Sequence, residues 1–242
     1  MITSKDNAKF KLWLKLTQKK VRTREHLFLV EGQHLVEEAF AAGVLKEVIL
    51  RENTNINIDV QKYYLPEVLF NKLSSTITSA GIVGVCKIIE IPLINYNRIL
   101  IVDNVSDPGN LGTLIRSALA FSFDGIILSY ETVDIYNEKV IRATQGAIFK
   151  LPIVRKDLLL EIKILKEKRV RTFATAFNQN SKIIHEVENV DQMAFIVGNE
   201  GAGVRKELIE LCDDSVIIPM SDSVESLNVG VAGSILMYEF KK

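Results

Sequence analysis

Residues 98–120 read RILIVDNVSDPGNLGTLIRSALA, in which a strand, a tight turn and a helix follow one another directly. The apolar run at 99–102 predicts a buried strand over 98–102, the residues at 107–109 predict a turn, and a helix is predicted at 111–121. The second half continues this alternation, with strands predicted at 125–129, 171–176, 194–198 and 215–218 and helices at 137–146, 157–168, 204–211 and 227–240. Such alternation indicates crossover connections and a mostly parallel sheet covered on both faces, so the predicted fold class is α/β.

Strands and helices also alternate in the first half of the chain, over fewer elements. Helices are predicted at 33–42 and 66–79, and strands at 26–32, near 48–50 and at 82–86. A break in composition near residues 91–97 predicts a domain boundary there. We therefore expect a small α/β domain at 1–95, carrying the N-terminal arm, and a larger α/β domain at 96–242.

The composition is that of an ordinary globular chain, with 242 residues of which 48% are hydrophobic and 25% charged. This apolar content excludes disorder as the main state, and no apolar run approaches the roughly 20 residues of a membrane-spanning helix. Cys86 and Cys212 are the only cysteines, which excludes a disulfide framework and a Cys-rich zinc site. The N-terminus lacks the apolar core of a signal peptide. The simplest interpretation is a reduced, cytoplasmic protein without a membrane segment or a metal centre.

Charge is distributed unevenly along a chain that is neutral overall, with 30 basic and 30 acidic residues. Residues 1–24 contain eight basic residues and one acidic residue, Asp6, so this arm carries a net charge of +7 and the rest of the chain −7. Phe10, Trp13, Leu14 and Leu16 recur among the lysines at helical spacing, which predicts an amphipathic basic helix. A basic arm on an acidic body favours a polyanionic partner, because phosphates release counterions on meeting Lys and Arg. A solvated basic helix without a partner is an equally good interpretation of the arm alone.

The first candidate site lies where the strand at 99–102 ends. Asn110 stands where it can cap the following helix or donate a hydrogen bond to a ligand, and Arg116 lies six residues further along. In parallel sheets ligands bind outside the carboxyl ends of the strands, which is where this loop falls. On these residues alone, a well-capped turn with a surface arginine explains the segment equally well.

A glycine-rich loop follows the strand at 194–198. It reads Gly-Asn-Glu-Gly-Ala-Gly over residues 198–203, and its glycines permit close backbone approach and positive φ. The glycine order differs from the dinucleotide fingerprint G-x-G-x-x-G, and the chain lacks the Gly-Lys-Ser/Thr of a phosphate-binding loop. Glu200 would repel a pyrophosphate, so the loop favours a ligand other than a dinucleotide.

The third segment runs from the last predicted strand into the last predicted helix. The helix at 227–240 is apolar almost all round, which predicts that it is buried. Gly230 and Gly233 weaken a helix by about 1 kcal/mol each relative to Ala, so they indicate another backbone packed very close to it. Ser226 and Asn228 precede the helix, where capping is the simplest explanation of both.

Together, these three segments resemble the three motifs of the SpoU (TrmH) branch of the SPOUT RNA methyltransferases. The matching residues are Asn110-x-Gly112-x-x-x-Arg116, Gly198-Asn199-Glu200-Gly201-x-Gly203, and Ile218-Pro219-Met220 with Ser226-Leu227-Asn228-Val229. The first half is similar to the L30e-like substrate-binding domain of that family through residues 28–32 and the β-α-β pattern that follows. The resemblance covers nearly the whole chain.

The resemblance implies a fold and an activity. It implies a SPOUT catalytic domain with a C-terminal trefoil knot, a homodimer formed through that domain, and S-adenosyl-L-methionine as cofactor. The implied reaction is methylation of a ribose 2′-hydroxyl in structured RNA, with rRNA favoured over tRNA by family analogy. A non-catalytic RNA-binding assembly factor on the same scaffold, or a different nucleotide-binding α/β enzyme, are the alternatives.

The resemblance also implies roles for individual residues. Those carried over as catalytic are Asn110, Arg116, Glu200, Ser226 and Asn228, and those carried over as cofactor-binding are Gly198, Gly203, Ile218, Met220 and Leu227. A guanidinium resists deprotonation, so Arg116 is better suited to anchoring a phosphate and stabilising alkoxide charge than to acting as a base. Asn110 and Ser226 would hold the ribose or Arg116, and Glu200 would orient Arg116 or a residue across the dimer. No metal is required.

Overall fold

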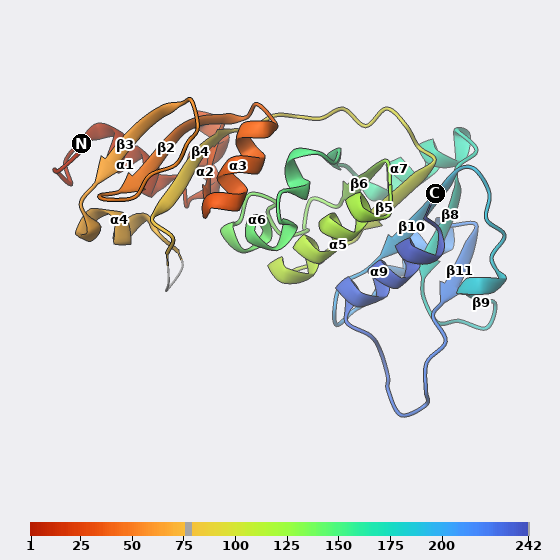
Figure 1. Cartoon of the computed structure of the whole chain (residues 1–242). Coiled ribbons are helices and arrows are strands. Elements are labelled where there is room, and N and C mark those ends of the chain that lie inside the picture. The colour runs from red at the N-terminus through yellow and green to blue at the C-terminus, as the bar shows by residue number, and fades with distance from the viewer. Residues whose placement is uncertain (76–78, 242) are drawn as a thin grey trace. The chain divides into compact units, whose positions relative to one another are not determined.

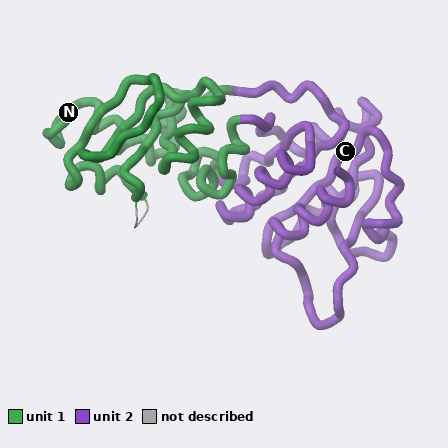
Figure 2. Tube along the Cα trace, in the orientation of Figure 1, with its two compact units in different colours: residues 1–89, 134–149 green, residues 90–133, 150–242 purple. Residues whose placement is uncertain are grey.

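The computed structural model describes residues 1–75 and 79–241, which form two compact units (Figure 2). Unit 1 comprises Met1–Ile89 and Asp134–Phe149, and unit 2 comprises Glu90–Val133 and Lys150–Lys242. None of the helices in the described ranges is long and apolar enough to cross a bilayer.

Unit 1 is a mixed sheet with helices packed against it (Figure 1). The sheet has the order β1-β4-β2-β3, in which β2 and β3 run parallel and β4 is antiparallel to both β1 and β2. Its strands are β1 (Leu27–Glu31), β2 (Leu45–Arg51), β3 (Gln61–Leu65) and β4 (Ile82–Lys87). Its helices are α1 (Ala8–Lys15), α2 (Lys19–Glu25), α3 (Gln33–Ala41), α4 (Glu67–Leu73) and α6 (Glu138–Thr144), with a 3₁₀ turn at Ala147–Phe149. The helix predicted at 66–79 therefore ends at Leu73, and residues 76–78 of that prediction lie outside the described residues.

The basic arm folds as two helices, α1 and α2, instead of the single helix expected. Phe10, Trp13 and Leu16 are 1%, 1% and 2% exposed and lie in the core with residues of β2, β3 and α4. This apolar stripe turns the lysines of α1 away from the core. Asn7 caps α1, since its side-chain oxygen accepts from the backbone N–H groups of Lys9 and Phe10.

Residues 134–149 return to unit 1 after the chain has begun unit 2. The ring of Phe28 on β1 lies 4.7 Å from that of Tyr136 and 6.3 Å from that of Phe149, measured between centroids. Arg22 of α2 forms a largely buried ion pair with Asp134 at 2.6 Å. This segment falls within the domain expected at 96–242, whereas in the structure it packs with the first unit.

Unit 2 is built on a parallel sheet with the order β7-β6-β5-β10-β8-β11-β9. Its strands are β5 (Arg98–Val102), β6 (Gly125–Leu128), β7 (Ile153–Arg155), β8 (Arg171–Thr175), β9 (Lys182–Ile183), β10 (Met193–Val197) and β11 (Asp214–Ile217). Its helices are α5 (Pro108–Ala120), α7 (Leu158–Glu167), α8 (Lys206–Leu211) and α9 (Val229–Glu239), with a 3₁₀ turn at Ile184–Glu186. The α/β fold with a mostly parallel sheet is confirmed.

Helices cover both faces of this sheet. Ile196 of β10 lies in one buried cluster with Leu158 and Ile162 of α7 and Leu208 of α8. Its neighbour Phe195 points to the other face, where its ring stacks 4.6 Å from that of Phe240 at the end of α9. The helices cover the two faces of the sheet and leave its carboxyl edge open. The loops at that edge can therefore form a binding site.

One face of α9 departs from the expectation of complete burial. Val231, Ile235 and Tyr238 are 47%, 39% and 56% exposed. The opposite side packs on α5, where a Cβ on Gly233 would lie 2.3 Å from the Leu114 side chain. The glycine therefore admits a leucine side chain, not a second backbone as predicted, and the prediction of a helix buried all round was wrong.

Candidate functional site

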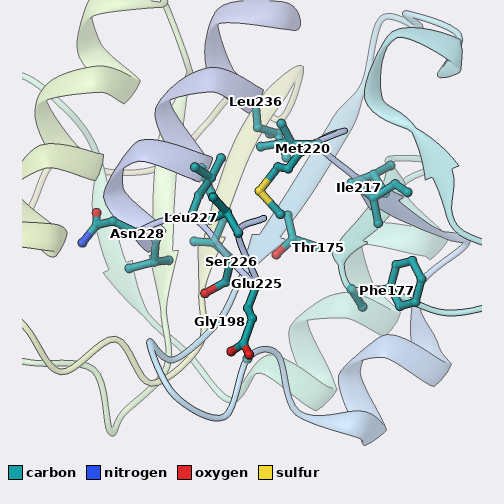
Figure 3. A pocket seen from close by; sticks show the side chains of 18 of the residues that line it. Thr175, Phe177, Gly198, Ile217, Met220, Glu225, Ser226, Leu227, Asn228 and Leu236 are labelled. Atoms are coloured by element: carbon teal, nitrogen blue, oxygen red, sulfur yellow. The ribbon is translucent and has the colours of Figure 1, made fainter. Parts of the chain in front are cut away.

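The loops after β5, β10 and β11 meet at the carboxyl edge of the parallel sheet, as the sequence predicts. The loops after β8, β10 and β11, together with the first turns of α9, line a cavity of about 880 Å³. Figure 3 shows Thr175, Met220 and Leu236 among the side chains that line it. A volume of this size accommodates a nucleoside-sized ligand.

The β10 loop closes on itself through its backbone. Asn199 and Gly203 exchange both N–H···O hydrogen bonds, at 3.0 and 2.9 Å, and the Asn199 side chain accepts from the N–H groups of Gly201 and Ala202. A Cβ on Gly198 would lie 2.1 Å from the Gly203 carbonyl carbon and 2.2 Å from the Val204 nitrogen. Only glycine at 198 leaves room for this loop.

Glu200 fastens the β10 loop to the β5 loop. One carboxylate oxygen accepts from the Asn110 side-chain amide at 3.0 Å and from the Asp107 N–H at 3.1 Å, and the other accepts from the Ser106 N–H at 3.2 Å. Partial burial would raise the pKa of Glu200, but these hydrogen bonds outweigh it and lower the pKa below its usual value. Glu200 is therefore ionised at neutral pH and acts as an acceptor that holds the two loops together.

Asn110 lies between Glu200 and Asn228. Its Nδ2 donates to Glu200, and its Oδ1 accepts from Asn228 Nδ2 at 2.8 Å. The N-cap of α5 is Asp107, whose Oδ1 accepts from the Asn110 N–H at 2.8 Å, so Asn110 itself is free for the contacts to the other loops. Asn228 caps α9 through its Oδ1, as the simplest explanation had it, and also forms this second contact.

A second connection between the loops was not anticipated from the sequence. Asp103, fully buried at the end of β5, accepts from the Arg205 N–H at 3.0 Å, from Nε at 2.9 Å and from a terminal guanidinium nitrogen at 2.8 Å. These bonds raise the pKa of Arg205 despite its partial desolvation. The available signal was an aspartate at the carboxyl end of a buried strand and an arginine just beyond the glycine loop.

The structure brings most of the sequence-predicted residues to one place. The cavity is lined by Gly198, Glu200, Gly203, Ile218, Met220, Ser226, Leu227 and Asn228. Asn110 does not line it but bonds to two residues that do. Arg116 lies on α5, is exposed, and has no hydrogen-bond or ion-pair partner within residues 1–75 and 79–241. Glu200 therefore does not orient Arg116 within one chain.

The cavity fits an adenosyl cofactor. Its walls combine apolar side chains, among them Ile218 and Leu227, with the close-packed backbone around Gly198, where a Cβ has no space. Such a wall offers apolar surface to a base and N–H and C=O groups to its polar edge. In the described residues no cluster of His, Cys, Asp and Glu is arranged to hold a metal ion.

Comparison with known proteins identifies the family. Residues 97–238 match the model of the SpoU rRNA Methylase family, and residues 7–84 match that of the MRM3-like substrate binding domain. The chain is 41% identical, over 99% of its length and 98% of the relative's, to the 23S rRNA (guanosine(2553)-2'-O)-methyltransferase RlmP of Bacillus subtilis (strain 168).

A second curated relative and a solved structure agree with this match. The 23S rRNA (guanosine-2'-O-)-methyltransferase RlmB of Coxiella burnetii is 33% identical, covering 87% of this chain and 82% of that protein. The structure of the AdoMet-bound rRNA methyltransferase from Sinorhizobium meliloti superposes with a TM-score of 0.85 at 28% identity, covering 98% of this chain and 95% of that one. The resemblance drawn from the three motifs is thus confirmed, and the chain belongs to the SpoU rRNA methylase family.

Proposed function

We propose that this protein transfers a methyl group from S-adenosyl-L-methionine to the 2′-hydroxyl of a guanosine in 23S rRNA, in the cytoplasm. The proposal rests on a cavity lined by the β10 and β11 loops, to which the β5 loop is joined by the hydrogen bonds of Asn110 with Glu200 and Asn228. The RlmP and RlmB relatives, which are named as 23S rRNA guanosine 2'-O-methyltransferases, support the choice of substrate.

A ribose 2′-hydroxyl is a weak nucleophile, so positioning is a large part of the rate. When bound, the cofactor supplies an electrophilic methyl group on a sulfonium sulfur. The ribose 2′-oxygen would take this methyl group in place of its hydroxyl proton, which would leave to solvent. Arg116 would anchor the neighbouring phosphate and stabilise the developing alkoxide.

The polar residues around the cavity would position the reacting ribose. Both ends of the Asn110 amide are engaged, by Glu200 and Asn228, so its orientation is fixed before substrate arrives. Ser226 is exposed at the cavity and has no hydrogen-bond partner among the described residues, which leaves its hydroxyl available to the ribose. Gly198, Gly203, Ile218, Met220 and Leu227 are proposed to hold the cofactor.

We also propose the trefoil knot for unit 2 and an L30e-like fold for the RNA-binding domain of unit 1. In support of the knot, β11 lies beside the edge strand β9, yet the following helix α9 packs on α5, where Ser234 and Ser117 share a hydrogen bond at 2.7 Å. In support of the second assignment, unit 1 is a mixed sheet with helices and matches a substrate-binding family.

Calorimetry with S-adenosyl-L-methionine tests the proposed function at its first step. Binding with micromolar affinity is expected. Absence of binding would contradict the enzyme assignment and leave the non-catalytic RNA-binding protein as the better explanation.

A homodimer through unit 2 is expected, because the exposed face of α9 presents Val231, Ile235 and Tyr238 to solvent. Light scattering at micromolar concentration should give twice the chain mass for the wild type and the chain mass for Ile235→Glu. Leu160→Glu, at an exposed leucine of α7, is the matched control and should remain dimeric. A monomeric wild type would refute the dimer.

The basic arm should bind RNA through phosphates. Four of its basic residues are engaged in ion pairs, whereas Lys5, Lys15, Lys19 and Lys20 are exposed without an ion pair among the described residues. Replacing Lys19 and Lys20 with Gln should flatten the slope of log K against log salt by about 1.4–1.8, at 0.7–0.9 per phosphate contact. The loss of RNA affinity should be the same for 23S rRNA transcripts of different sequence, because phosphate contacts carry no information about the bases.

The matched control for the arm replaces Lys163 and Lys206, exposed on α7 and α8, with Gln. Binding is measured for both variants at several salt concentrations. An unchanged slope for the arm variant would mean that the arm is only a solvated pair of helices.

A further inference from the structure

Phe177 is the least buried of the large hydrophobic side chains in the described residues, with 90% of its surface exposed. It follows β8 and lines the cavity between the loops of β10 and β11. In Figure 3 it lies at the far end of the lining side chains from Asn228. A phenylalanine exposed to this degree contributes no burial of its own to the stability of the fold.

The turn that carries Phe177 is held firmly on both sides. On one side, Ala176 donates its N–H to the Val216 carbonyl at 3.3 Å. On the other, Asn178 donates from Nδ2 to the hydroxyl of Ser215, a buried residue of β11, at 2.8 Å. Ser181 closes the turn, since its hydroxyl accepts from the Asn178 N–H and donates to the Ala176 carbonyl. The ring is therefore presented to the cavity by an ordered backbone.

Other exposed apolar side chains surround the same cavity. Met220 and Val224, in the loop after β11, are 42% and 51% exposed and line it as well. No described aromatic ring lies against Phe177. An apolar rim with an unpaired, pre-positioned ring matches a flat aromatic ligand group, because offset stacking adds to area burial.

We propose that Phe177 stacks on the adenine of S-adenosyl-L-methionine and sets the affinity for the adenosyl group, an inference that rests on the proposed function. On the proposed function, the reacting end of the ligand would face Glu200 and its hydrogen-bond partner Asn110, on the loops of β10 and β5. Phe177 follows β8, and β10 lies between β8 and β5 in the sheet. Two strand spacings separate β8 from β5, a distance of about 10 Å. This separation matches the length of an adenosyl group. Burying the charged amino-acid tail against an apolar rim would cost far more hydration free energy than burying the neutral face of adenine.

The test compares two ligands by calorimetry: S-adenosyl-L-methionine and 5′-methylthioadenosine, which keeps adenine and ribose but lacks the amino-acid tail. Phe177→Ala should weaken both by about tenfold, within the range for aromatic stacking. Phe177→Trp should bind both within about twofold of the wild type, and its fluorescence should be quenched by 5′-methylthioadenosine. The thermal unfolding temperature of both variants should match the wild type, because the side chain is exposed.

Tyr130→Ala is the matched control. Tyr130 is a second exposed aromatic, at 64%, and follows β6 at the same edge of the sheet without lining the cavity. Its loss should leave both affinities unchanged.

Three results would overturn the proposal. Unchanged affinity of Phe177→Ala for both ligands would exclude contact with the cofactor, and a loss for S-adenosyl-L-methionine alone would assign the ring to the amino-acid tail. A loss confined to binding of a 23S rRNA transcript would assign it to the substrate. If the wild type binds neither small ligand, the proposed function itself fails, which is a separate outcome.

Discussion

Replacing Arg116 with alanine should lower the single-turnover rate of methyl transfer by about 10²–10³-fold, the loss expected for one charge-stabilising donor. Affinity for S-adenosyl-L-methionine should stay within about threefold, because Arg116 does not line the cavity. The guanidinium is exposed and has no partner in the part of the chain that the structure describes, which leaves it free to meet a phosphate. Rates are measured by transfer of labelled methyl to RNA, and affinity by calorimetry.

Two further variants separate charge from geometry at Arg116. Arg116→Lys keeps the charge but loses the two-pronged donor arrangement, so its rate should fall between those of the wild type and the alanine variant. Lys163→Ala, at an exposed residue of α7, should behave as the wild type. Turnover of Arg116→Ala at the wild-type rate would refute the assignment.

Gly198→Ala should reduce cofactor affinity by about 50-fold or more. The added Cβ would lie 2.1–2.3 Å from backbone atoms of Gly203 and Val204, so the loop must move. The clash cannot be relieved by rotation of a side chain, because the atoms it meets belong to the backbone. Two backbone hydrogen bonds between Asn199 and Gly203 also hold this loop in place. Calorimetry measures the loss, and thermal unfolding shows whether the variant remains folded.

Gly201→Ala makes the same chemical change in the same loop and is the control. Its Cβ would meet nothing closer than the Asn199 Oδ1 at 3.7 Å. This variant should bind the cofactor as the wild type does. Equal affinities for the alanine variants at 198 and 201 would mean that the β10 loop does not shape the binding site.

Much of the parallel sheet could be predicted because its central strands are apolar runs between turn-forming residues. β5 and β10 lie within one residue of their predicted bounds, since both are buried on two faces and have no polar alternation. β3, β7 and β9 were missed. β7 and β9 are only three and two residues long, and β3 reads QKYYL, which is mostly half-exposed and carries little apolar signal.

The candidate site could be predicted in its residue types but not in its contacts. The capping of α9 by Asn228 follows from local sequence, whereas its bond to Asn110 spans 118 positions and depends on the tertiary fold. The pairing of Asp103 with Arg205 also depends on the tertiary fold, as does the position of Phe177 at the cavity. The exposed face of α9 was missed because hydropathy alone does not distinguish a fully buried helix from one with an exposed apolar face.

The most direct test maps ribose methylation across the 23S rRNA of a strain lacking this protein, complemented with the wild type or with Arg116→Ala. One guanosine should lose its 2′-O-methyl group in the deletion strain, regain it with the wild-type gene and lack it with the variant. The same methylation pattern in the deletion and wild-type strains would refute the proposed function.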